Sequence, residues 1–291
     1  MAIKALLRQW ELTPHKELGQ NFLVDQRVLG QILAAAEISA ADTVLEIGPG
    51  LGTLTLALAE QARRVVAVEL DQQLVAILHD RLQAFRNVQV VVGDILALDI
   101  SGLLGAEQAS SLAERDAGDP TWRAYKVVAN IPYNITSAVL RHLLEARTRP
   151  RLIVLMVQRE VAQRITAKPG DMSLLSVSVQ FYGRPRLMHR VPARAFYPVP
   201  KVDSAIIRID PHPHLPLEPE EVEPFFAVVR AGFGQRRKQL RNSLSHGLGL
   251  SVERIAGALA QAGVDGERRA QTLGISEWVT LYRALRDVAK Q

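Results

Sequence analysis

The tetrapeptide Asn130-Ile131-Pro132-Tyr133 combines residue types that can hold a planar amino group. The side-chain carbonyl of Asn130, with a backbone carbonyl near Ile131 or Pro132, can accept both hydrogens of such a group. Pro132 fixes its own φ and restricts the residue before it, and Tyr133 offers an aromatic face for a stacked base. Taken alone, such a tetrapeptide is more typical of a simple turn. Whether it forms a binding site therefore depends on which other segments of the chain lie next to it.

Three other segments end in residues that suit a nucleoside ligand. In Glu46-Ile-Gly48-Pro-Gly50-Leu-Gly52 the glycines allow the backbone to approach a ligand closely. Glu69 follows 21 residues after Gly48, where a carboxylate can accept from ribose hydroxyls. Asp94 can accept from an adenine amino group. Each has a structural alternative, a turn, a cap or an exposed carboxylate, but four such endings in succession favour one binding site.

The glycine turn favours S-adenosylmethionine over a dinucleotide. Its pattern is G-x-G-x-G rather than G-x-G-x-x-G, and it contains no Lys or Arg to meet a phosphate. Glu46, two residues before the first glycine, suits the cationic methionine part of S-adenosylmethionine. A nicotinamide-dependent enzyme is the weaker alternative, which calorimetry with both ligands would distinguish.

The predicted chemistry is methyl transfer to the amino group of an adenine. That nitrogen is a poor nucleophile because its lone pair is conjugated into the ring, and hydrogen bonds to Asn130 would make the lone pair available. A stacked base cannot reach such a pocket, so it must be flipped out. Phe196 is the predicted second aromatic of the sandwich, with Tyr197 as its competitor and core packing as the alternative role of Phe196.

Hydrophobic periodicity predicts an α/β fold that positions these residues at strand ends. The expected strands are Thr43–Ile47, Arg64–Glu69, Val88–Val92, Lys126–Ala129 and Leu152–Val157, with further strands at Leu174–Phe181 and Ser204–Ile209. Helical stretches such as 51–61 and 72–84 alternate with the first strands. This alternation is typical of a doubly wound, mostly parallel, Rossmann-like sheet with helices on both faces. Ligands bind beyond the carboxyl ends of such strands.

The chain divides into two predicted domains. Residues 1–210 form the sheet domain, with a surface insertion at 101–123 that is rich in Ala, Ser, Gly and Glu. A proline-rich linker is expected at 211–224, and residues 225–291 read as a small all-helical domain. From residue 225 onward there are eleven Lys and Arg but five Asp and Glu, whereas the first 224 residues hold 24 and 25. This distribution favours a surface for a polyanion in the helical domain, although a solvated basic helix face explains the charge alone equally well.

Composition limits the remaining possibilities. The 291-residue chain has no cysteine, which excludes disulfides, thiolate zinc sites and cysteine nucleophiles. No apolar run is long enough for a membrane span or a signal peptide, so a cytoplasmic protein is expected.

The motifs together resemble the ribosomal RNA adenine dimethyltransferase family over nearly the whole chain. The similar segments include 16–23, 46–55, 68–71, 93–94, 128–135, 158–161, 196–204 and 233–244. The resemblance implies a class I methyltransferase fold and S-adenosylmethionine held by Asn21, Leu23, Gly48, Glu69, Asp94 and Asn130. Asn130, Pro132, Tyr133 and Phe196 are the catalytic residues predicted from the chemistry above. The implied reaction is dimethylation of two adjacent adenosines in a hairpin loop near the 3′ end of 16S rRNA, within the immature 30S subunit.

Arg236, Arg237, Lys238 and Arg241 are the expected RNA contacts, and they would hold phosphates in a salt-dependent way. The enzyme is expected to be a monomer that uses no metal. Two alternatives stay open: an adenine-N6 methylase of 23S rRNA of the antibiotic-resistance type, and a non-catalytic ribosome-assembly or transcription factor with the same fold.

Overall fold

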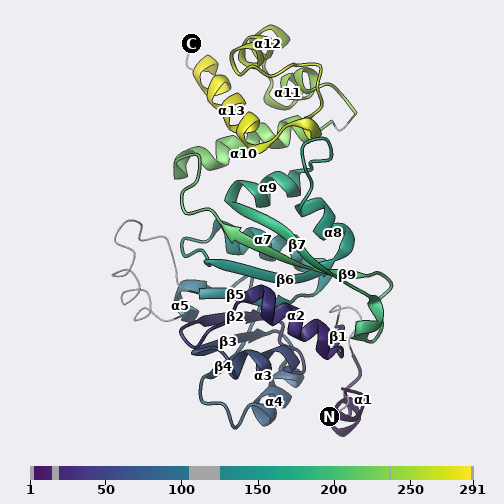
Figure 1. Ribbon diagram of the computed structural model, residues 1–291. Helices are drawn as coiled ribbons and strands as arrows, with labels where there is room; N and C mark the ends of the chain where they lie inside the picture. The colour runs from purple at the N-terminus through teal and green to yellow at the C-terminus, as the bar shows by residue number, and fades with distance from the viewer. Residues whose placement is uncertain (1–2, 15–19, 105–124, 236, 290–291) are drawn as a thin grey trace. The chain divides into compact units, whose positions relative to one another are not determined.

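The computed structural model describes residues 3–14, 20–104, 125–235 and 237–289, and its centre is a seven-stranded sheet (Figure 1). The strands are β2 (Thr43–Ile47), β3 (Arg64–Glu69), β4 (Val88–Val92), β5 (Tyr125–Asn130), β6 (Leu152–Gln158), β7 (Gly183–Val191) and β9 (Ser204–Pro211). Their order is β4-β3-β2-β5-β6-β9-β7. The strands from β4 to β6 are parallel, and β9 runs antiparallel to β6. The predicted mostly parallel α/β sheet is confirmed.

Helices cover both faces of this sheet because the strand order reverses beside β2. The chain moves outward from β2 through α3 (Thr53–Ala59) to β3, and through α4 (Gln72–Arg81) to β4. It moves the opposite way from β5 through α7 (Thr136–Glu145) to β6. Right-handed crossovers therefore place α3 and α7 on opposite faces (Figure 1). Such a reversal point is where doubly wound sheets bind ligands.

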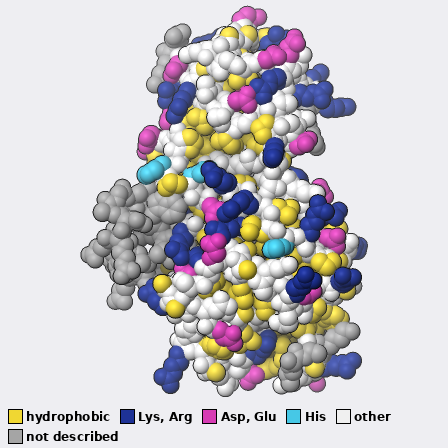
Figure 2. Space-filling view, in the orientation of Figure 1, with side chains coloured by type: hydrophobic (Ala, Val, Ile, Leu, Met, Phe, Trp, Pro, Cys, Tyr) yellow, Lys and Arg dark blue, Asp and Glu magenta, His cyan; other side chains and the backbone are white. Residues whose placement is uncertain are grey.

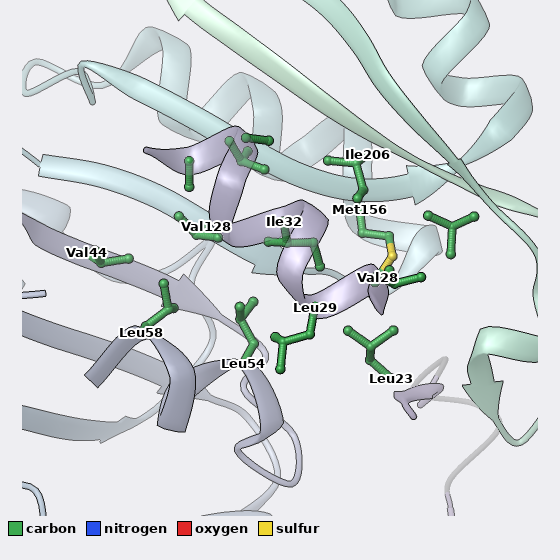
Figure 3. Close-up of a cluster of buried hydrophobic side chains, with 14 of the residues drawn as sticks. Leu23, Val28, Leu29, Ile32, Val44, Leu54, Leu58, Val128, Met156 and Ile206 are labelled. Carbon is green, nitrogen blue, oxygen red and sulfur yellow. The ribbon is translucent and has the colours of Figure 1, made fainter. Parts of the chain in front are cut away.

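A buried aliphatic cluster holds α3 and α2 (Gln26–Ala36) against the sheet (Figure 3). Helix α2 contributes Val28, Leu29 and Ile32, which recur at helical spacing and are at most 8% exposed. The side chains that they meet are Leu54 and Leu58 of α3, and Val44, Val128, Met156 and Ile206 of the strands. This packing fixes the strands whose ends carry the predicted site residues.

The N-terminal segment forms a second, two-stranded sheet with a loop from much later in the chain. Strand β1 (Phe22–Leu23) pairs antiparallel with β8 (Phe196–Tyr197), with Leu23 opposite Phe196. The backbone N–H of Val24 also donates to the carbonyl oxygen of Ala195 over 2.8 Å. These contacts secure the segment that carries Asn21 and Leu23.

The chain folds into two compact units whose boundary differs from the predicted one. One unit contains residues 1–162 and 185–211, and the other contains 163–184 and 212–291. In the second unit α9 (Leu174–Tyr182) packs on α10 (Pro219–Phe233), where the rings of Phe181 and Phe225 stack with centroids 4.8 Å apart. This contact between residues distant in sequence explains why 163–184 belong with the C-terminal helices.

The predicted linker at 211–224 is too long. Strand β9 includes Pro211, and α10 begins at Pro219. Glu218 and Glu221 form a reciprocal capping box, and Pro219 occupies the first helical position, where a missing N–H costs nothing. Pro219, one of the prolines that suggested a linker, is therefore the first residue of a helix. The other helices of this unit are α11 (Leu240–Leu248), α12 (Val252–Gln261) and α13 (Ile275–Ala289).

The predicted strand at Leu174–Phe181 is wrong, because this segment is helix α9. Ser173 and Ser176 form a capping box at its start. The alternation of polar and apolar residues suggested a strand with one polar face. In the structure, Ser176 and Gln180 lie one helical turn apart and donate to backbone carbonyls of Arg164, Ile165 and Ala167.

Of the predicted insertion, residues 101–104 end helix α5 (Ile100–Leu104), and 105–123 lie outside the described residues. Across the described parts of the chain, no helix has both the length and the apolar character that a bilayer span requires.

Candidate active site

A cleft at the carboxyl ends of β2, β3 and β5 brings together the residues predicted to bind the cofactor. The empty space in and directly in front of it, open solvent included, is about 1170 Å³. The lining includes every predicted cofactor residue, namely Asn21, Leu23, Gly48, Glu69, Asp94 and Asn130. It also includes Pro132 and Tyr133. The topology therefore places side chains from five separate chain segments around one space.

Gly48 lets the turn after β2 pass close to the end of β5. Its φ is +66°, in the left-handed region that favours glycine. A Cβ at this position would lie 3.6 Å from Cδ of Pro132 and 3.9 Å from the carbonyl oxygen of Asn130. The Gly48 N–H donates to the carbonyl oxygen of Val68 over 2.9 Å, which joins the turn to β3. The missing side chain leaves room for a ligand between two strand ends.

Glu69 closes the other side of the glycine turn. Its Oε2 accepts from the N–H of Gly50 over 3.0 Å, and its Oε1 accepts from the N–H groups of Leu70 and Asp71 over 2.9 and 3.0 Å. Burial raises the pKa of Glu69 above its ordinary value, against the lowering effect of these three donors. Each carboxylate oxygen has further lone pairs, so the group can still accept from hydroxyls.

Glu46 lies beneath the cleft with only 1% of its surface exposed. The pKa of Glu46 is raised to about 8, mainly by burial; Thr55 opposes this shift and the nearby charge of Glu69 contributes to it. Its Oε2 has no hydrogen-bond partner among the described residues. A buried, unpartnered carboxyl oxygen beside a ligand cleft fits a cationic ligand group.

Asp94 lies at the exposed edge of the cleft, after β4. Its Oδ1 accepts from the N–H of Leu96 over 2.9 Å, which fixes the side chain over its own turn. Strand β4 is the edge strand, and β3 and β2 lie between it and β5. Asp94 and Asn130 therefore lie at opposite ends of the row of strand ends that forms the cleft.

Asn130 ends β5 and is held by the N-terminal segment. Its Nδ2 donates to the main-chain oxygen of Asn21 over 3.1 Å. The amide nitrogen and oxygen diverge from Cγ, so this bond determines which side of the group carries the acceptor. Oδ1 accepts no hydrogen bond from the described residues. Asn130 thus lines the cleft with a carbonyl oxygen that has no donor among the described residues.

Tyr133 follows in a single 3₁₀ turn (Tyr133–Ile135) and is half-buried at the cleft wall. Its hydroxyl lies 2.6 Å from Oγ of Ser204, the first residue of β9. Burial raises the pKa of Tyr133, so the phenol stays protonated at neutral pH.

The structure does not place Phe196 at the cleft. Its ring is 1% exposed and packs in the aliphatic core with Leu23, Val28 and Met156. A ring with so little exposed surface cannot stack on a base in this arrangement. Phe196 therefore has the alternative role considered above, packing in the core. Tyr197 is half-buried and packs against the separate cluster around Phe22. Of the predicted stacking rings, Tyr133 alone lines the cleft.

The cleft also has an apolar wall, which was not predicted from the sequence. Leu70, Ile95 and Ile131 line it, and each directly follows one of the predicted polar residues, Glu69, Asp94 or Asn130. Leu70 is 56% exposed, which is unusual for a leucine, whereas Ile95 and Ile131 are buried. The sequence contains a pattern that could have predicted this wall: an acidic or amide residue is followed by an aliphatic residue at or just after the end of each of the three strands.

The predicted RNA-binding residues lie in the other unit. Arg237 and Lys238 are exposed in the turn before α11, and Arg241 is half-buried in the first turn of that helix. Arg236 lies outside the described residues. Lys and Arg side chains are exposed on both units in Figure 2, interspersed with Asp and Glu, so the basic excess of the C-terminal unit does not form one patch on the face shown. No group of three or more His, Asp or Glu side chains in the described ranges is arranged to hold a metal ion.

Comparison with known proteins identifies close relatives. Residues 12–287 match the family model for ribosomal RNA adenine dimethylase. A protein of Dehalococcoides mccartyi strain CBDB1, named ribosomal RNA small subunit methyltransferase A, is 46% identical over 96% of this chain and 90% of its own length. The protein of the same name from Moorella thermoacetica is 44% identical over 97% of this chain and 96% of its own.

Two solved structures extend the comparison. The crystal structure of the 23S rRNA methyltransferase ErmE has a TM-score of 0.70 and 31% identity, covering 91% of this chain and all of that one. A dimethyladenosine transferase from Plasmodium falciparum has a TM-score of 0.76 at 23% identity, covering 92% of this chain and 98% of that one. The second match shows a shared fold.

Proposed function

The chain belongs to the ribosomal RNA adenine dimethylase family, and we propose that it dimethylates the N6 amino groups of two adjacent adenosines in 16S rRNA. The proposed target is the hairpin loop near the 3′ end of that RNA, within the immature 30S subunit in the cytoplasm. The protein would act as a monomer. The observation that carries this choice is identity to small-subunit methyltransferases of 44–46% over nearly the full chain.

The cleft fits S-adenosylmethionine as the methyl donor. Glu69 would accept from the ribose hydroxyls, Asp94 from the adenine amino group, and the turn at Gly48 would admit the methionine part. Glu46 is protonated in the ligand-free fold at neutral pH, and the cationic part of the bound cofactor would favour its ionised form. Leu23 and Asn21 would close the cleft from the N-terminal segment. Bound there, the cofactor supplies an electrophilic methyl group on a positively charged sulfur.

Asn130 would activate the target nitrogen by accepting its hydrogens. Oδ1 of Asn130 is an acceptor whose orientation the bond to Asn21 maintains. Accepting from the amino group draws its nitrogen toward a tetrahedral geometry and exposes the lone pair. Pro132 stiffens the loop, and Tyr133 offers a ring on which the extruded base can stack, worth roughly 1–3 kcal/mol. Positioning and electrostatics then account for the rate enhancement without a general base.

Arg237, Lys238 and Arg241, with Arg236, would contact phosphates of the RNA. Such contacts strengthen binding without reading sequence, so selection of the target depends on the shape of the RNA loop and on the flipped base. Two separate units would thus divide binding and chemistry between them.

Incubation with 30S and 50S particles from a strain that lacks the modification tests the proposal. Mass analysis of nucleosides should find N6,N6-dimethyladenosine in 16S rRNA. Asn130→Ala should abolish transfer and retain RNA binding. Asn87→Ala, which also removes a side-chain amide hydrogen bonded to backbone oxygens but lies outside the cleft, should retain transfer. Unchanged turnover of Asn130→Ala would refute the role given to this residue.

A second candidate is methylation of 23S rRNA, favoured by the 31% identity to ErmE over 91% of the chain. Product confined to the 50S particles would select it. The absence of product from both particles, with RNA binding intact, would select a non-catalytic assembly or transcription factor.

A further inference from the structure

The hydroxyl of Tyr133 is tied to a residue that cannot touch the substrate. The oxygen atoms of Tyr133 and Ser204 lie 2.6 Å apart, although the residues are separated by 71 positions in sequence. Ser204 has no exposed surface, whereas Tyr133 lines the cleft. Either hydroxyl can donate in this bond. The contact therefore joins a half-buried ring at the cleft wall to a fully buried side chain behind it.

Ser204 occupies a rigid position. It is the first residue of β9 and lies opposite Gln158 in the antiparallel pairing with β6. The preceding residue, Asp203, accepts through its main-chain oxygen from the N–H of Arg159 and through Oδ1 from the N–H of Ala193, both over 3.0 Å. The start of a helix at Arg159, the start of a 3₁₀ turn at Ala193 and strand β6 thus converge on Asp203 and Ser204. Oγ of Ser204 has little freedom to move.

The backbone around Tyr133 is held more weakly. The residue begins a single 3₁₀ turn, in which the N–H of Ile135 donates to the carbonyl oxygen of Pro132 over 3.3 Å. The carbonyl oxygen of Tyr133 accepts from Oγ1 of Thr136 over 3.2 Å. Both contacts are local, and isolated 3₁₀ turns have poorer hydrogen-bond geometry than α-helices. The bond to Ser204, by contrast, links the hydroxyl of the ring to the first residue of a sheet strand.

We propose that Ser204 is a positioning residue that fixes the Tyr133 ring in the orientation required to stack the target adenine beside Asn130. This inference rests on the proposed function. Without the bond, the ring can rotate about its side-chain torsions, and the base then reaches Asn130 in the productive pose less often. The predicted effect falls on the chemical step and on stacking, while the cofactor contacts are unchanged.

A double-mutant cycle tests the link. Ser204→Ala and Tyr133→Phe remove the bond from opposite ends, and Tyr133→Phe keeps the ring. Each is expected to lower kcat about three- to tenfold, as the loss of one hydrogen bond allows, with the affinity for S-adenosylmethionine within about twofold of wild type. The double variant should be no slower than the slower single variant, because both changes delete the same interaction.

Two matched controls remove similar bonds away from the cleft. Tyr125→Phe deletes a buried tyrosine hydroxyl that donates to the carbonyl oxygen of Thr148 over 2.9 Å, at the opposite end of β5. Ser101→Ala deletes a hydroxyl that lies 2.9 Å from Oγ1 of the same threonine. Both should keep wild-type kcat.

A fluorescent base separates positioning from a general loss of stability. An RNA hairpin with 2-aminopurine at the target position, saturated with protein and cofactor product, should show quenched fluorescence when the base stacks on Tyr133. Ser204→Ala and Tyr133→Phe should both relieve the quenching. If the wild type methylates 30S particles and both variants keep wild-type kcat and wild-type quenching, the role of Ser204 is refuted and the proposed function stands. A wild type that forms no dimethyladenosine would instead overturn the proposed function.

Discussion

Glu46 is expected to make the ligand-free protein less stable as the pH rises. In the unfolded chain this carboxyl group titrates near its ordinary pKa of 4.5, whereas burial raises the pKa of Glu46 in the fold to about 8. Between these two values the folded state binds more protons than the unfolded state. The free energy of unfolding therefore falls with increasing pH across this window and levels off above about pH 8.

The magnitude follows from the size of the pKa difference. At 1.36 kcal/mol for each pH unit, the loss between pH 4.5 and 8 is at most on the order of 5 kcal/mol. Relaxation of the protein and entry of water around a newly ionised carboxylate would reduce it. Glu46→Gln removes the titrating proton and keeps the side-chain shape. This variant should gain stability relative to wild type at pH 8, and the two should converge near pH 5.

Urea unfolding followed by circular dichroism at several pH values between 5 and 9, without cofactor, measures this difference. Glu60→Gln makes the same chemical change at the exposed end of α3 and serves as the matched control. Because burial also raises the pKa of Glu69, some pH dependence should remain in Glu46→Gln. The reasoning fails if the curves of wild type and Glu46→Gln stay parallel from pH 5 to pH 8.

Three further changes have defined outcomes. Gly48→Ala places a side chain where φ is +66°, which costs about 1–2 kcal/mol, and calorimetry should show weaker cofactor binding; equal affinity would contradict the close approach at this turn. Lys126→Met removes the ammonium group 2.9 Å from the buried carboxylate of Asp42, which keeps Arg151 and Ser39 as partners, so unfolding should be easier by about 1.5–3 kcal/mol; an unchanged melting temperature would show that the pair is dispensable. Replacing Arg237 and Lys238 by Ala should reduce the slope of log affinity against log salt by about 0.7–0.9 per residue, in a titration of 30S binding; an unaltered slope would remove both from the phosphate contacts.

The strand ends that form the cleft could be predicted from the sequence. Each buried parallel strand is a short apolar run, so the residue that follows it is identifiable, as with Gly48, Glu69 and Asn130. Carboxyl ends of adjacent parallel strands share one edge of a sheet, and this geometry brings the residues together without knowledge of side-chain packing. The cofactor roles of Asn21 and Leu23 came from family resemblance, since the pairing of β1 with β8 leaves no local signal.

Features that depend on contacts between distant segments could not be predicted. Leu174–Tyr182 alternates like a strand, but Ser176 and Gln180 bond the carbonyls at the end of the preceding helix, which only the folded chain brings close. Phe196 was predicted to stack on the base, but its strand pairs with β1 at Leu23 and its ring lies in the core. The Tyr133–Ser204 bond has no signature in either segment.

The position of the segment between Leu104 and Tyr125 has a consequence for how the chain can vary. The carbonyl oxygen of Leu104 accepts from Nη1 of Arg64, the first residue of β3, over 2.9 Å, and Tyr125 is the first residue of β5. Both attachment points therefore lie at the amino ends of strands, and the length of β5, about 16 Å, separates them from Asn130. We therefore expect additions or deletions between these points to leave the cleft geometry unchanged. A dye or affinity tag introduced between these points should leave methyl transfer unchanged.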